Sequence, residues 1–163
     1  MDTDSCKALA ISSFQLMESG DATLAQQIIA AEFTNREADD DPGQPERSLR
    51  GPPGFLATSS WLRSAFADLR FVDLEAIAES DKVVVQATMT GRHTGEFHGI
   101  PPTLKRFRQR QIHVFRLQSG RIIEHLAQRD DLGLLLHLGW RPESPQPTGR
   151  GFLAIPPRST ERR

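Results

Sequence analysis

Four stretches of strand-type sequence, separated by short turn-like segments, dominate the second half of the chain. They cover 71–78, 82–92, 107–117 and 121–128. Glu79-Ser80-Asp81 and Gln118-Ser119-Gly120 are short separators, which favour strands that follow one another as antiparallel neighbours. Between the second and third stretches, 93–103 is too rich in glycine and proline to continue a ladder and predicts a structured loop. The sequence therefore predicts a meander of about four antiparallel strands.

Three helices are predicted before this sheet, and one short helix is predicted after it. Apolar residues suit helices over 4–17, 22–31, 54–67 and 132–138. Asp21 is placed to cap the second helix, and Asp68 is expected to end the third. Segment 37–53, with an acidic run and four prolines, predicts a loop that crosses the mouth of a pocket. The predicted fold class is α+β.

The length of 163 residues suits a single domain with one hydrophobic core. We expect the folded domain to cover residues 1–140. The remainder, 141–163, is rich in proline, glycine and arginine and is predicted to be disordered. A net charge of −1 leaves no overall field to attract a polyanion, so a nucleic-acid partner is not expected.

Other features of the sequence bear on the compartment and on cofactors. The single cysteine, Cys6, cannot form an internal disulfide, which favours a reducing cytoplasm. The acidic first residues do not resemble a secretory signal, and the longest apolar runs are far shorter than the roughly 20 residues of a membrane span. Because no phosphate loop, zinc-ligand spacing or nucleophile elbow is present, we expect no bound nucleotide, cofactor or metal.

Five short blocks of sequence resemble a known family. In chain order they are FTNREA at 33–38, GPPGF at 51–55, WLRSAFADL at 61–69, HTGEFHGIPPT at 93–103, and GRIIEH at 120–125 followed by DDLGLL at 130–135. Over roughly residues 5 to 140 the chain is similar to the SnoaL-like polyketide and ester cyclases, which share the nuclear transport factor two-like fold. The resemblance implies a cone-shaped antiparallel sheet, packed against three N-terminal helices, around a pocket for a small hydrophobic or aromatic carbonyl compound.

The resemblance also implies positions for catalytic residues. In characterised cyclases of this family, an aspartate near the end of the last strand and a histidine on the preceding strand serve acid–base chemistry in an aldol closure. The histidine corresponds to His113, but the aspartate position, two residues after His125, holds Ala127. An aldol closure needs a base for an acidic C–H proton and a donor for the enolate oxygen, and alanine supplies neither.

Strand alternation predicts which side chains lie beside His113. If His113 points inward, Gln109, Gln111 and Phe115 point inward with it, because side chains two residues apart share a face of a strand. This arrangement predicts a wall on which two glutamines, a histidine and a phenylalanine contact the substrate, together with Ala127. Alternatively, His113 is a hydrogen-bonded histidine on a half-buried strand.

His125 and Asp130 are the other candidates for acid–base chemistry. Alternation places His125 on the strand face of Ile123 and Ala127, so its imidazole replaces the missing base if the two histidines converge. Asp130 and Asp131 lie about a turn beyond Ala127, where they offer a carboxylate. Their position before an apolar run also explains both as capping residues of the last helix.

Asn35, Trp61 and Phe66 are predicted to contact the ligand from outside the main strands. Asn35 resembles a polar residue at the pocket mouth of the family, although asparagine is equally expected where a helix ends. Trp61 and Phe66 lie on the inner face of the predicted third helix, where they offer flat apolar surfaces to a polycyclic or aromatic ligand. Core packing is the alternative for both rings.

On the opposite face of the third predicted strand, arginines alternate beside Ile112 and Val114. These arginines are Arg106, Arg108, Arg110 and Arg116. The stripe is either a solvated face of the sheet or the surface of a homodimer. We expect the homodimer, because pairing through this face is common in the fold that the sequence resembles.

Two main hypotheses for function follow. The first is a cofactor-independent cyclase, isomerase or lyase in which His113, with His125, performs acid–base chemistry. The second is a binding or accessory module that holds an apolar ligand without changing it, for which Ala127 is the best support. An accessory role in hydroxylation is a third alternative, and no residue of the sequence tests it.

Overall fold

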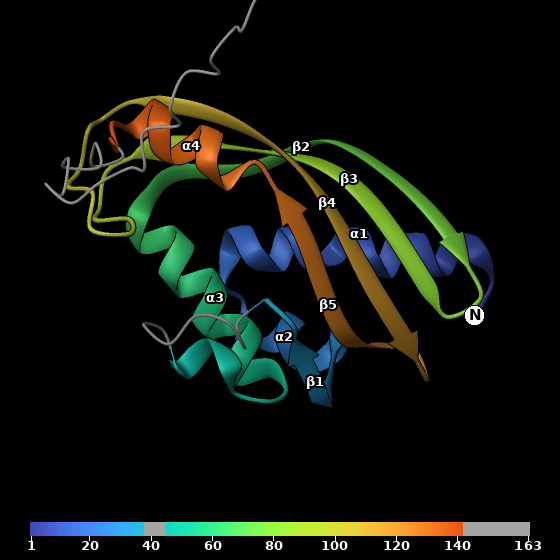
Figure 1. The fold of residues 1–163 in the computed structure, drawn as a ribbon. Helices are drawn as coiled ribbons and strands as arrows, with labels where there is room; N and C mark the ends of the chain where they lie inside the picture. The colour runs from blue at the N-terminus through green and yellow to red at the C-terminus, as the bar shows by residue number, and fades with distance from the viewer. Residues whose placement is uncertain (38–44, 142–163) are drawn as a thin grey trace, which may run out of the picture.

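The computed structural model describes residues 1–37 and 45–141, in which one curved sheet arches over helices (Figure 1). The elements are α1 (Thr3–Ser19), α2 (Ala22–Ile28), β1 (Ile29–Asn35), η1 (Pro45–Ser48), α3 (Pro52–Ala65), β2 (Phe66–Glu79), β3 (Lys82–His93), β4 (Arg106–Gln118), β5 (Arg121–Arg129) and α4 (Asp131–Leu138). Residues 38–44 of the predicted loop and the predicted tail beyond 141 lie outside the described residues. No helix in the described part is long and apolar enough to cross a membrane.

The four long strands form the predicted meander. β2 pairs with β3, β3 with β4 and β4 with β5, each pair antiparallel. The register places Val85, His113 and Ala127 side by side on β3, β4 and β5. On β4, inward residues alternate with outward ones along the whole strand, so the predicted face of His113 is confirmed. The helices pack against that face.

A fifth strand, β1, extends the sheet beyond the meander. The predicted second helix ran to residue 31, but α2 ends at Ile28 and the chain continues as β1, which pairs parallel with β5. Ala30 and Ala31 favour a helix locally. The extended backbone instead buries Phe33 completely, with its ring 5.8 Å from that of Phe55. The predictions of a longer helix and of a purely antiparallel sheet are therefore wrong at this edge.

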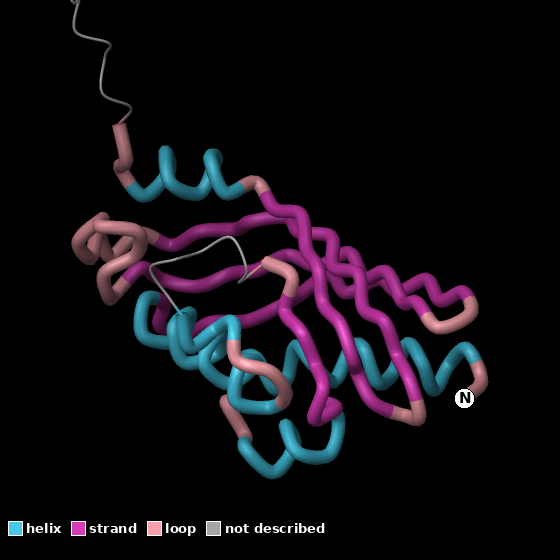
Figure 2. Tube along the Cα trace, turned by 60° about the horizontal axis from the view of Figure 1, so that its bottom comes forward, coloured by secondary structure: helices cyan, strands magenta, loops and turns pink. Residues whose placement is uncertain are grey.

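The third helix also differs from its prediction. α3 stops at Ala65, so Phe66 is the first residue of β2 and does not lie on the inner face of a helix. Asp68 does not end the helix. Instead, Asp68 and Asp73 adopt positive φ angles of 56° at two register shifts between β2 and β3. Such bulges bend a strand and increase its twist, and Figure 2 shows the resulting curvature of the sheet.

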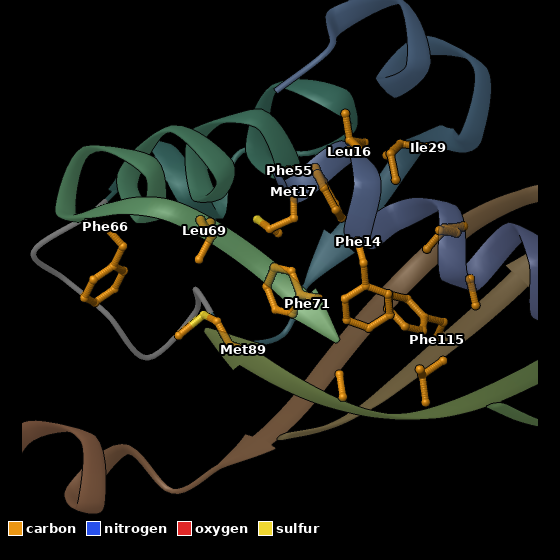
Figure 3. Packing of buried hydrophobic residues seen from close by; sticks show 14 of the residues in the cluster. Phe14, Leu16, Met17, Ile29, Phe55, Phe66, Leu69, Phe71, Met89 and Phe115 are labelled. Atoms are coloured by element: carbon orange, nitrogen blue, oxygen red, sulfur yellow. The ribbon is translucent and has the colours of Figure 1, made fainter. Parts of the chain in front are cut away.

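α1 fills the concave face of the sheet with its apolar side. The ring of Phe14 lies 5.1 Å from that of Phe71 on β2 and 5.9 Å from that of Phe115 on β4 (Figure 3). The same phenylalanine packs edge-on against the imidazole of His113 at 4.9 Å. The hydrophobic core therefore reaches as far as this histidine and fixes the plane of its ring.

Candidate active site

A cavity of about 330 Å³ opens between the inner face of the sheet and the helices. This volume lies at the lower end of the usual range for small-molecule sites. The lining residues are Met17, Asn35, Glu37, Arg47, Thr58, Trp61, Leu62, Phe71, Met89, Phe97, His98, Gln109, Gln111, His113, His125, Arg129 and Asp131. Six of the predicted site residues therefore line this one cavity: Asn35, Trp61, Gln109, Gln111, His113 and His125.

The two histidines converge at the centre of this wall. His113 Nδ1 lies 2.9 Å from His125 Nε2, within hydrogen-bond distance, and both side chains are buried. The rings are nearly parallel, and the Phe115 ring stacks on that of His125 at 4.9 Å. Packing on three sides leaves the imidazoles little freedom to turn, so the contact between their nitrogens is preorganised.

Two glutamine side chains connect His113 to a carboxylate. Gln111 Oε1 lies 2.8 Å from His113 Nε2, and Gln111 Nε2 donates to Gln109 Oε1 at 2.8 Å. Gln109 Nε2 in turn donates to Asp131 Oδ1 at 2.9 Å. Strand alternation placed the glutamines correctly beside the histidine, whereas Asp131 enters from the first turn of α4.

Asn35 closes the other end of this chain of hydrogen bonds. Its Oδ1 lies 3.2 Å from His125 Nδ1, and its Nδ2 donates to Thr58 Oγ1 at 3.4 Å. The Thr58 hydroxyl donates to the carbonyl oxygen of Gly54, one turn earlier in α3, at 3.2 Å. The donor role of the hydroxyl fixes the orientation of the asparagine amide, so that its oxygen faces His125.

Glu37, which follows β1, contributes a buried carboxylate to the same wall. Its side chain is only 8% exposed, and its Oε2 forms an ion pair with Arg129. Its Oε1 lies 3.7 Å from His125 Nδ1 and has no hydrogen-bond partner among the described residues. Arg129 also contacts Asp131 Oδ1 at 3.3 Å, which links the two carboxylates. Glu37 thus lines the cavity with one buried carboxylate oxygen that has no hydrogen bond in the described part of the chain.

Burial sets the charge of these groups. Burial lowers the pKa of His113 well below its ordinary value, and the nearby His125 and Arg129 lower it further. Burial also lowers the pKa of His125, although the Glu37 carboxylate opposes part of this effect. Burial acts on Arg129 in the same direction, but Glu37 and Asp131 outweigh it and raise the pKa of the guanidinium. At neutral pH the His113 and His125 imidazoles are therefore neutral and the Arg129 guanidinium is charged.

The mouth of the cavity is aromatic and basic. The guanidinium of Arg47, on η1, lies 4.3 Å from the centre of the Trp61 ring, and the Phe97 ring lies 5.1 Å from the same indole. Arg47 is itself buried, so η1 covers part of the indole. Trp61 lines the cavity, and the predicted loop contributes a cation over its ring.

A family model described as SnoaL-like polyketide cyclase matches residues 11–138 of this chain. The chain belongs to the SnoaL-like polyketide cyclase family. This result confirms the resemblance that the five sequence blocks carried, and the α+β fold agrees with it.

Individual relatives of this SnoaL-like chain agree with the family match. The chain is similar to the aklanonic acid methyl ester cyclase DauD of Streptomyces sp. (strain C5), with 36% identity over 110 residues that cover 67% of this chain and 66% of that protein. It is 35% identical to the aklanonic acid methyl ester cyclase DnrD of Streptomyces peucetius over 105 residues, 64% of this chain and 70% of that one. Among solved structures, TsrD from Streptomyces laurentii gives a TM-score of 0.73 at 27% identity, covering 85% and 98% of the two chains. The chain thus spans about two thirds of the length of the two curated relatives.

Four of the predicted site residues do not line the cavity. Phe66 packs behind it, 4.7 Å from the rings of both Phe97 and Phe107. Asp130 caps α4 by accepting a hydrogen bond from the Gly133 amide at 2.9 Å, which agrees with its capping interpretation. The other two are Phe115, which lies behind the histidines, and Ala127, which is buried opposite His113 on β5.

One detail of β5 departs from simple alternation. A register shift between β4 and β5 near Leu117 makes Ile122 the fully buried residue, whereas Ile123 is only half-buried. The predicted pairing of His125 with Ile123 on one face is therefore wrong, although Ala127 does share the face of His125. The bulge shifts the start of the strand without moving the histidine from the wall.

Sequence reasoning did not single out Glu37 or Arg129 as site residues, and it interpreted Asp131 either as a carboxylate near Ala127 or as a capping residue. The missing signal was β1, because this strand carries the chain to His125 and Glu37 lies in the turn directly after its last residue, Asn35. Arg129 lies two residues after Ala127 on β5. Within 1–37 and 45–141 no three His, Cys, Asp or Glu side chains lie together as metal ligands do. The polar part of the lining consists of hydrogen-bonded imidazole, amide, carboxylate and guanidinium groups.

Proposed function

We propose that this SnoaL-like protein is a cofactor-independent cyclase that closes a ring within a polyketide-type keto ester by an intramolecular aldol addition. The observation that carries the proposal is the Oε1 atom of Glu37. It is a buried carboxylate oxygen on the cavity wall, without a hydrogen bond in the described structure and 3.7 Å from an imidazole. A base in this setting is held in place and partly desolvated, as general base catalysis requires.

In the proposed reaction, Glu37 Oε1 removes a proton from a carbon that lies between two carbonyl groups of the substrate. The resulting enolate carbon attacks a ketone carbonyl of the same molecule, and the new C–C bond leaves an alkoxide. Arg129, on the cavity wall, places positive charge near the developing enolate. The proton passes from Glu37 to His125 Nδ1 and returns to the alkoxide as a hydroxyl. The product is an isomer of the substrate.

Ala127 does not oppose this proposal. The family pattern places a carboxylate at that position on the last strand, but here Ala127 is buried opposite His113 and away from the cavity wall. Glu37 supplies a carboxylate from the neighbouring β1 side instead. Because β1 pairs in parallel with β5, with Asn35 beside His125, the end of β1 delivers Glu37 next to the histidines. In this proposal the catalytic carboxylate comes from the turn after β1 rather than from β5.

The direct test offers the purified protein the substrates named for its relatives, beginning with aklanonic acid methyl ester. We expect a product of unchanged mass that separates from the substrate by chromatography and has one ketone fewer by ¹³C NMR. The Glu37→Gln variant serves as the negative control. Saturable binding of the ester with no isomer after long incubation would show a binding module and overturn the proposal.

We also propose that two copies associate through the outer face of the sheet. Ile77, Val84, Val114 and Leu126 are register neighbours that form one apolar row across β2, β3, β4 and β5. Ile77 is 69% exposed, which is unusual for a large apolar side chain in mid-strand. Arg116, two residues after Val114 on the same face of β4, is paired with Asp81 in the same chain, and Arg108, farther along β4, is paired with Asp73. Such a row suits a self-complementary contact.

A single charge in this row is expected to disrupt the dimer. Leu126→Glu buries a carboxylate against the apolar row of the second copy, so sedimentation at micromolar concentration should change from a dimer to a monomer. Leu132→Glu, at an exposed apolar residue in the first turn of α4, is the matched control and should leave the mass unchanged. A wild-type protein that sediments as a monomer would contradict the proposal.

A further inference from the structure

We propose that the His113–His125 pair acts as a one-proton store, whose hydrogen-bonded chain from Asp131 to Asn35 is complete only when the pair carries one extra proton. The inference rests on the proposed function for its role in the reaction. It makes Asn35 and Asp131 positioning residues that act on the histidines rather than on the substrate. Its structural part depends only on which groups along the chain donate and which accept.

Both ends of the chain are acceptors. At one end, Asp131 is a carboxylate paired with Arg129, so it can only accept from Gln109. The amide of Gln109 then presents its oxygen to Gln111 Nε2, and Gln111 presents its own oxygen to His113 Nε2. That contact is a hydrogen bond only if His113 carries a proton on Nε2.

At the other end, Asn35 donates its amide nitrogen to Thr58, whose own hydroxyl proton goes to the Gly54 carbonyl. Asn35 therefore presents its oxygen to His125 Nδ1, and this contact also needs a proton on the imidazole. Between the ends, the contact of 2.9 Å between the two rings needs a third proton. Three hydrogen bonds thus require three protons on the two rings.

Two neutral imidazoles carry only two protons, so in the neutral pair one of the three contacts sets two lone pairs against each other. Adding one proton completes all three hydrogen bonds. A buried contact without its hydrogen bond is costly, so the network favours uptake of one proton and opposes part of the effect of burial. A second added proton has no acceptor left in the chain.

The charges around the pair fit a single stored proton. Glu37 is the carboxylate that faces His125 from beyond β1, and Arg129 faces it from β5, at the other side of Glu37. Asp131 is joined to His113 through the two glutamines. The neighbours from the other elements, Phe14 on α1, Phe71 on β2 and Phe115 on β4, are apolar. The Glu37 carboxylate therefore balances the charge of one imidazolium. Two imidazolium groups would repel each other and the Arg129 guanidinium.

This store has a direct place in the proposed reaction. The proton that leaves the substrate carbon must wait while the new C–C bond forms and must then reach the alkoxide. Transfer from Glu37 Oε1 to His125 Nδ1 completes the chain at that moment, so the network stabilises the intermediate more than the resting state. An interaction of this kind, stronger after proton transfer than before, raises the rate rather than only the affinity.

The test follows the ring nitrogens of the full chain by ¹H–¹⁵N NMR as the pH is lowered from 8, with circular dichroism to define the range in which the protein stays folded. His113 and His125 should change together in one step that adds one proton to the pair. The signals of the exposed His98 and His137 rings are recorded in the same spectra as an internal reference. Two independent steps near the ordinary histidine pKa, each adding a proton to its own ring, would overturn the proposal.

Two substitutions at Asn35 test the proposal even if the protein unfolds in acid before the wild-type pair takes up its proton. Asn35→Leu removes the terminal acceptor, so two protons satisfy the remaining contacts and the joint step should move to lower pH by about one unit. Asn35→Asp keeps an acceptor beside His125 and adds a negative charge. In this variant the His113–His125 pair should therefore already hold one extra proton at pH 7. A neutral pair in Asn35→Asp, or an unchanged midpoint in Asn35→Leu, would contradict the one-proton store. These results do not depend on turnover, so they stand apart from a failed cyclase assay.

Discussion

The Glu37→Gln variant is expected to lose about two to four orders of magnitude in kcat for ring closure, the range that a positioned general base contributes. Glutamine has nearly the same shape as glutamate and keeps an oxygen for the Arg129 guanidinium, but its amide does not accept a proton at neutral pH. The variant should still bind the ester with an affinity close to that of the wild type. Product analysis at fixed reaction times measures kcat, and titration with the ester measures the affinity.

The matched control for this prediction is Glu32→Gln. Glu32 lies on the same strand, β1, but its side chain is exposed and away from the cavity. It removes the same charge and should leave kcat unchanged. If Glu37→Gln closed the ring at the wild-type rate, the base would be another group and the assignment of Glu37 would be wrong.

Acidification is expected to destabilise the protein steeply below pH 6.5. His113 and His125 have pKa values below the ordinary value in the folded chain because they are buried, whereas both regain it on unfolding. Below pH 6.5 the unfolded chain therefore binds more protons than the folded chain. The stability that these groups contribute is fully present above pH 6.5 and falls by up to about 1.4 kcal/mol per pH unit for each histidine as the pH decreases toward its folded-state pKa.

Urea unfolding at a series of pH values between 8 and 5 measures this slope. His113→Gln keeps a side chain that can donate to Gln111 and accept from His125. Because it removes one titrating imidazole, the dependence of the free energy of unfolding on pH should become shallower by the amount that one bound proton contributes. His137→Gln, at an exposed residue of α4, should leave the slope unchanged. An equal slope in the wild type and in His113→Gln would mean that other groups dominate the acid sensitivity.

The sequence was sufficient for most of the sheet but not for the edge that completes the site. Alternation over β4 placed Gln109, Gln111 and His113 on one face, because a long strand with one buried side repeats that signal many times. β1 is short, follows directly from α2 and contains two alanines, so its local sequence resembles the end of a helix. Its conformation is decided by pairing with β5, a segment far away in the chain.

The same limit explains the errors in the site. Glu37 was quoted only as part of a family block, since its meaning depends on the extended path of β1 toward His125. Phe66 was assigned to a helix because the aromatic pattern of α3 continues past Ala65 without a local stop. Asp130 had two interpretations that sequence could not separate, and its hydrogen bond to Gly133 agrees with capping. In each case a tertiary contact outweighed the local pattern.

The parallel pairing of β1 with β5 also bears on how the chain folds. Asn35 lies beside His125 across a loop of about ninety residues, so this contact carries a large loop-closure entropy and belongs to the slow part of folding. During synthesis, Glu37 leaves the ribosome well before the histidines that it contacts. The meander of β2 to β4 can form first, with α1 on its concave face, and still lack the base. Under the proposed function, proton transfer is thus confined to molecules in which the first and last strands have already paired.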